Sequence, residues 1–143
     1  MGYQLPPIVK AAERLMGEIE IAVTRFPRAH KHRLGEDLRR EAMEVAWHAH
    51  RAWRDRDRQD EHINELADAI DRLKLRMQLG QQVKAFASFA QFEMLARLAG
   101  DLGRQCGGWQ KRRSGKGQNA GAAKREQRPS ILSSRAASSG ANP

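Results

Sequence analysis

Four stretches of this chain repeat apolar residues at intervals of three and four, which is the spacing of one face of an α-helix. A helix that is apolar on one side only has to pack that side against another element. Short connections separate the four stretches, and this arrangement favours an antiparallel four-helix bundle. The apolar positions are Ile8, Ala12, Leu15, Ile19, Ala22 and Phe26, then Leu34, Leu38, Ala42, Val45, Ala49 and Ala52, then Ile63, Leu66, Ile70, Leu73 and Met77, and finally Phe92, Leu95, Ala99, Leu102, Cys106 and Trp109. We therefore predict an all-α fold.

Local signals give approximate helix ends. Pro6-Pro7 can start the first helix, and Pro27 disfavours helical geometry at the residue before it, so it ends that helix. The second helix is expected from about residue 29 to residue 54. Asp60 is a candidate N-cap for the third helix. Ser88-Phe89-Ala90-Gln91 has the form of a capping box and predicts the start of the fourth helix.

The composition fits one soluble domain. The chain has 143 residues, of which 40% are apolar, and no apolar run approaches the length of a membrane span. No charged-then-apolar leader with a cleavage site opens the sequence, so we expect a cytoplasmic protein with no membrane association. The single cysteine, Cys106, lies on the fourth apolar stripe and is expected to be a small buried hydrophobe.

Positive charge is concentrated near the C-terminus. The net charge is +9; residues 1–83 carry 15 Lys and Arg against 14 Asp and Glu, and residues 84–143 carry 11 against 3. Residues 114–143 are rich in Gly, Ala, Ser, Arg and Lys, so we predict a bundle over 1–113 and a disordered basic tail over 114–143. Such a polarised charge favours a polyanionic partner, with nucleic acid first and an acidic protein surface second.

Cations align on the two later helices. Arg97, Arg104 and Lys111 are seven residues apart on the fourth helix, on a different side from its apolar stripe, and Arg72 and Arg76 share an outward face of the third. A solvated charged face with a frayed helix end is the alternative. The candidate nucleic-acid- or partner-binding residues are Arg72, Lys74, Arg76, Arg97, Arg104, Lys111, Arg112 and Arg113.

A second candidate surface is apolar. Met43 and Trp47 fall on the side of the second helix opposite its apolar stripe, which favours a subunit or partner contact over isolated exposed residues. Glycines inside the fourth apolar pattern, Gly107 and Gly108 with Gly103, suggest a surface that something approaches closely. The candidate oligomer-interface residues are Met43, Trp47, Gly107 and Gly108.

The motifs give no sign of catalysis. The neighbouring histidines, at 30 and 32 and at 48 and 50, are not spaced to bind one ion, and the histidines are expected at the surface or in turns. Gly115-Lys116-Gly117 lacks the rest of a phosphate-binding loop. The apolar stripes contain no acid pair and no nucleophile–base couple. We therefore expect neither an enzyme nor a bound metal or cofactor.

Three motifs follow one another along the chain. They are Phe26-Pro27-Arg28-x-His30-Lys31 with Leu34-Gly35, then Ile70-Asp71-Arg72-Leu73-Lys74, then Gly103-Arg104-x-Cys106-Gly107-Gly108-Trp109. In this order they resemble the small four-helix-bundle proteins related to the accessory variability determinant of diversity-generating retroelements. The resemblance covers about residues 8–113 and continues into the basic segment that follows. One departure is on the third helix, where this chain has Leu73-Lys74 and Gln78 in place of the family's usual Leu-Arg-x-x-x-Arg; another is Cys106, in place of a more usual aliphatic residue.

The resemblance implies a non-enzymatic subunit. Proteins of that family form a homopentameric barrel with a positively charged surface, and they bind the retroelement reverse transcriptase and nucleic acid, RNA and DNA. Their role is in adenine-mutagenic cDNA synthesis from a template-repeat RNA. The same broad family includes bundle proteins encoded in ribosomal RNA intervening sequences. An oligomeric scaffold of that type, binding an acidic protein without a specific RNA role, is the alternative.

Overall fold

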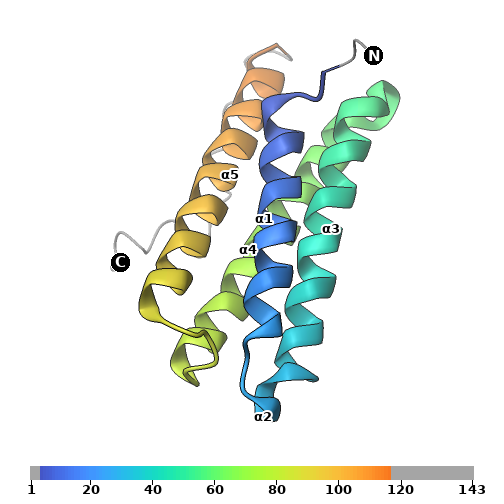
Figure 1. Cartoon of the computed structure of the whole chain (residues 1–143). Helices are drawn as coiled ribbons and strands as arrows, with labels where there is room; N and C mark the ends of the chain where they lie inside the picture. The colour runs from blue at the N-terminus through green and yellow to red at the C-terminus, as the bar shows by residue number, and fades with distance from the viewer. Residues whose placement is uncertain (1–3, 117–143) are drawn as a thin grey trace.

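The computed structural model describes residues 4–116 and is all-helical over that range, with no β-strand. Four long helices carry the fold, and two short helical segments lie between them (Figure 1). The long helices are α1 (Pro7–Thr24), α3 (Leu34–Arg54), α4 (Gln59–Gln82) and α5 (Phe89–Lys116), and the short segments are α2 (Arg28–Lys31) and η1 (Arg56–Arg58).

The long helices form a four-sided bundle. α1 packs against α3 and α5, and α4 packs against the same two helices from the opposite side (Figure 1). Successive long helices run in opposite directions, so the start of α1 and the end of α5 lie at the same end of the bundle. The predicted four-helix bundle is therefore confirmed for residues 4–116.

The apolar stripes form one continuous core. The predicted core positions are buried on all four helices, except that Phe92 and Trp109, at the two ends of the α5 stripe, are partly buried. Cys106 is buried as expected, and its thiol lies 3.7 Å from the Ile63 carbonyl oxygen. Pro7 lies at the start of α1, as predicted. The periodicity of three and four was sufficient to identify the core because each stripe has one packing direction.

The second helix starts later than predicted. Residues 28–31 form the separate short helix α2, with Pro27 in extended geometry before it, and α3 begins only at Leu34. Gly35 explains the close turn between these segments. A Cβ at Gly35 would lie 2.7 Å from Val23 Cγ1 and 3.6 Å from the His30 carbonyl oxygen. The chain therefore bends back onto α1 at a position that has no room for a larger residue.

The predicted cap of the third long helix was also wrong. Asp55, not Asp60, supplies the capping oxygen in this connection, because its carboxylate accepts the Arg58 backbone N–H at 3.3 Å and closes η1. The hydrogen bond from His62 holds the pKa of Asp55 below its ordinary value, with a smaller contribution from the Arg58 N–H. Asp60 lies in the first turn of α4, and its carboxylate contacts Arg113 of α5 at 2.7 Å.

α4 ends in a Schellman-type turn. The Ala85 N–H donates to the Gly80 carbonyl at 2.9 Å, and the Lys84 N–H donates to the Gln81 carbonyl at 3.1 Å. Lys84 occupies the left-handed position of this turn, with φ of 58°, where glycine is usual. The Phe86 ring then covers Gly80, where a Cβ would lie 2.7 Å from Phe86 Cε2. The turn thus directs the chain back along the bundle into α5.

Ser88 caps α5 as the sequence predicts. The Gln91 N–H donates to Ser88 Oγ at 3.1 Å, and the Gln91 side chain accepts the Ala87 N–H at 3.4 Å. At the other end, α5 runs through residues 114–116, which the sequence assigned to the tail. The rest of the predicted tail, residues 117–143, lies outside the described residues.

Candidate nucleic-acid interface

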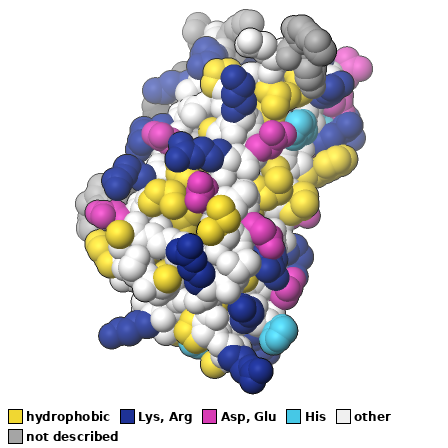
Figure 2. Space-filling model, in the orientation of Figure 1, with side chains coloured by type: hydrophobic (Ala, Val, Ile, Leu, Met, Phe, Trp, Pro, Cys, Tyr) yellow, Lys and Arg dark blue, Asp and Glu magenta, His cyan; other side chains and the backbone are white. Residues whose placement is uncertain are grey.

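α5 presents its cations to solvent on the side away from the core. Arg97, Arg104 and Lys111 are all exposed, and each lies about two helical turns from the next. Lys and Arg side chains follow the edge of the molecule that carries α5, with acidic side chains between some of them (Figure 2). The predicted cations therefore form an accessible strip along one helix, interrupted in places by acidic side chains.

The three cations differ in their neighbours. Arg104 donates to Asp101, one turn earlier on α5, with 2.6 Å between its guanidinium nitrogen and the carboxylate oxygen. Within residues 4–116, neither Arg97 nor Lys111 forms an ion pair or side-chain hydrogen bond. An anion can therefore bind these two without displacing a carboxylate, whereas at Arg104 it has to compete with Asp101.

The end of α5 adds two further predicted cations. Arg112 is exposed, and Arg113 is tied to Asp60 at the start of α4 at 2.7 Å. A helix C-terminus carries partial negative charge, so basic residues there also stabilise the helix itself. Arg113 thus has a structural role in joining α5 to α4, and Arg112 extends the exposed strip.

The two arginines of α4 are paired across the bundle. Arg72 lies 3.2 Å from Glu41 of α3, and Arg76 lies 2.9 Å from Asp37 and 3.5 Å from Glu41. Glu41 is only 7% exposed, and burying a carboxylate is costly unless it has such partners. Arg72 and Arg76 therefore hold α4 to α3, and most of their charge is balanced by acids of the same chain.

Lys74 lies between α4 and α5. A Cβ at Gly103 would approach its ammonium nitrogen to 3.0 Å, so this glycine makes space for a side chain of the same chain. Burial lowers the pKa of Lys74, an effect that Asp71 opposes and Arg104 reinforces. By contrast, a Cβ at Gly107 would meet no atom within 4 Å, and one at Gly108 would meet only the Arg112 guanidinium at 3.5 Å.

The predicted apolar surface on α3 is exposed. Met43 and Trp47 are 56% and 55% exposed, one helical turn apart, and the Arg51 guanidinium lies 5.7 Å from the centre of the Trp47 ring. Other large apolar side chains are exposed on α4 and at the start of α5. They are Leu75, Leu79, Val83 and Phe89. The chain therefore presents more than one apolar area that a partner could cover.

The expectation for the histidines was wrong in part. His30 and His32 lie in or next to the short α2 helix, as expected of turn residues. His62, however, is buried, and its ring lies close to Glu65 and Asp55. His48 of α3 lies against the same Glu65, although His48 and His62 are 14 residues apart in the chain. Spacing between neighbouring histidines could not predict this pair, because His48 and His62 lie on different helices. The spacing His62-x-x-Glu65 does indicate two groups on one helix face.

Comparison with known proteins supplies no relative, since no family model, curated protein or solved structure matches this chain. Within residues 4–116, none of the helices is both long enough and apolar enough to span a membrane.

Proposed function

We propose that this chain is a non-enzymatic accessory protein of a diversity-generating retroelement, which binds the reverse transcriptase and nucleic acid to support mutagenic cDNA synthesis. Support comes from the three motifs described above, from the four-helix fold and from the charge on α5. The observation that carries the nucleic-acid role is the strip on α5 where Arg97 and Lys111 are exposed and have no acidic partner within residues 4–116.

The proposed mode of binding is contact with phosphates. Lysine and arginine side chains along one helix can follow a nucleic-acid backbone, and such contacts position the strand without reading its sequence. Among the predicted cations, this assigns the main role to Arg97, Lys111 and Arg112, with Arg104 as a weaker contributor. Arg72, Arg76 and Arg113 mainly hold helices together in this proposal.

Assembly would multiply this weak surface. By resemblance, we propose that the chain forms a homopentameric barrel in the cytoplasm, in which Met43 and Trp47 of α3 and Gly107 and Gly108 of α5 lie at subunit contacts. Several copies of the α5 strip would then bind one polyanion together, so modest contacts from each subunit would add.

The test is a fluorescence titration of single-stranded RNA at several salt concentrations. For single strands, the slope of log affinity against log salt is about 0.7 per phosphate neutralised. The double variant Arg97→Gln/Lys111→Gln should therefore flatten the slope by about 1.4 for each subunit that contacts the strand. The matched control is Arg40→Gln/Arg58→Gln, which removes the same charge from exposed arginines that pair with Asp37 and Glu61.

Equal slopes of log affinity against log salt for the two double variants would show that α5 does not contact the RNA. An acidic polypeptide provides the second arm of the experiment. If it binds more tightly than RNA at the same salt concentration, and loses that binding in the α5 variant, the chain is a scaffold for an acidic protein. Circular dichroism of each variant checks that the fold is retained.

A further inference from the structure

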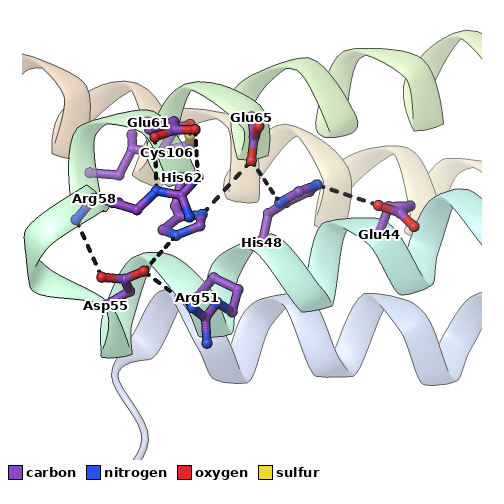
Figure 3. A network of polar contacts seen from close by, with 10 residues as sticks. Glu44, His48, Arg51, Asp55, Arg58, Glu61, His62, Glu65 and Cys106 are labelled. Atoms are coloured by element: carbon purple, nitrogen blue, oxygen red, sulfur yellow. Dashed lines mark hydrogen bonds and ion pairs between the residues drawn. The ribbon is translucent and has the colours of Figure 1, made fainter.

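Three side chains from α3 and α4 converge near the end of the bundle where these helices are joined (Figure 3). His48 comes from α3, and His62 and Glu65 lie one turn apart on α4. One ligand atom from each lies within 4.8 Å of the other two. The side chains of His62 and His48 are 8% and 15% exposed, whereas Glu65 is 48% exposed. The cluster therefore has a buried side and an opening to solvent.

Both histidines direct Nδ1 toward Glu65. The distances to Glu65 Oε1 are 3.5 Å from His48 and 3.8 Å from His62, which are too long for hydrogen bonds. Both Nδ1 atoms are buried, and within residues 4–116 neither has a hydrogen-bond partner. Both nitrogens face the Glu65 carboxylate but neither forms a hydrogen bond. Leaving two buried ring nitrogens without a partner costs folding free energy unless something else binds them.

The opposite nitrogen of each ring lies on a carboxylate. His62 Nε2 is 3.1 Å from Asp55, and His48 Nε2 is 3.4 Å from Glu44 (Figure 3). An ionised carboxylate only accepts hydrogen bonds, so the hydrogen bond with Asp55 places the hydrogen of a neutral His62 ring on Nε2 and leaves the lone pair on Nδ1. The 3.4 Å between His48 Nε2 and Glu44 is too long for a hydrogen bond and leaves both tautomers of His48 open. Histidines that bind metals in proteins are commonly oriented in this way, with a carboxylate behind the ring.

The spacing fits a tetrahedral ion. Zinc binds nitrogen and oxygen ligands at about 2.0–2.2 Å, which places neighbouring ligand atoms about 3.3–3.5 Å apart. The observed nitrogen-to-carboxylate distances of 3.5 and 3.8 Å need a contraction of at most a few tenths of an ångström. The ligand atoms of the two histidines lie within 4.8 Å of each other, so the two rings would also turn toward each other around the ion. We propose that His48 Nδ1, His62 Nδ1 and the Glu65 carboxylate bind one divalent first-row transition-metal ion, with Zn²⁺ the best match to this ligand set.

Such an ion would join α3 to α4 beside their connection. Three protein ligands leave one tetrahedral position for water or for an added ligand on the exposed side of Glu65. This inference is independent of the proposed nucleic-acid role, because none of these residues belongs to the α5 strip.

The experiment is calorimetric titration of metal-free, full-length protein with ZnCl₂, together with thermal unfolding. We expect one ion per chain, and a rise in Tm on the order of 10 °C at a hundredfold excess of Zn²⁺ over its Kd. The test variant is Glu65→Gln, which removes a ligand from a half-exposed position and should leave the fold intact. Removing partners behind metal ligands already costs about 10–100-fold in affinity, so loss of a direct ligand should weaken Zn²⁺ binding by about 100-fold or more.

His50→Gln is the matched control. His50 also pairs with a carboxylate, Glu13 at 2.7 Å, but lies outside the cluster, so this variant should bind Zn²⁺ as the wild type does. Absence of Zn²⁺ binding, or equal binding by wild type and Glu65→Gln, would overturn the proposal. In the first case the three residues form an ion-pair cluster; in the second, any bound zinc lies elsewhere on the chain.

Discussion

Trp47 offers the sharpest test of assembly. It is 55% exposed on the outside of α3, where its loss leaves no core cavity, so Trp47→Ala should leave the monomer folded. A tryptophan side chain presents about 200 Å² of surface, so roughly 110 Å² remains to be covered by a partner. At about 25 cal/mol per Å², covering it would stabilise a subunit contact by about 3 kcal/mol. Its removal should weaken association about 100-fold.

The assay is sedimentation velocity over a dilution series of wild type and variant, with circular dichroism to check helical content. Ile21→Ala is the matched control, because Ile21 is a large apolar residue, 48% exposed, on α1 rather than on α3. A wild type that stays monomeric over the series refutes the reasoning. So does an association constant that Trp47→Ala leaves unchanged, since the ring would then be a solvated surface residue.

Three further substitutions test the fold and its electrostatics. Gly35→Ala should lower the free energy of unfolding by about 1–2 kcal/mol, because its Cβ would meet Val23 Cγ1 at 2.7 Å. Gly107→Ala is the control and should not lower it, because its Cβ would meet no atom within 4 Å. Urea unfolding of both variants measures the difference. Lys84→Gly should raise the free energy of unfolding by about 1 kcal/mol by relieving the left-handed turn position, and an unchanged urea midpoint would contradict this. Lys74→Met should raise Tm at neutral pH, because burial lowers the pKa of Lys74 in the folded state and so disfavours its charged form. That penalty is present below the folded pKa and fades as pH rises toward 10.5, so the two Tm values should converge there; a constant difference would show that packing causes it.

The helices and the core could be predicted because their signals are local. Pro7 at the start of α1, Ser88 as the cap of α5 and the four apolar stripes each depend on residues within a few positions of one another. The predicted start of α3 was wrong, because Gly35 fits against Val23 of another helix. No local pattern encodes that contact.

How far the candidate site residues could be predicted depended on whether their neighbours lie on the same helix or on another one. Sequence spacing correctly predicted that Arg97, Arg104 and Lys111 share an exposed face of α5, because one helix sets their positions. It could not show that Arg72 and Arg76 face Glu41 and Asp37, or that His48 lies opposite His62 and Glu65. Those pairs depend on how α3 and α4 are aligned along the bundle, which single-helix periodicity leaves open.

The most direct test of the account is co-purification. The tagged chain is expressed with the reverse transcriptase and the template-repeat RNA of the retroelement to which we propose it belongs. We predict that both elute with the tagged chain, and that Arg97→Gln/Lys111→Gln lowers the amount of bound RNA while the protein stays folded. Elution of the chain without the reverse transcriptase and without the RNA would contradict it.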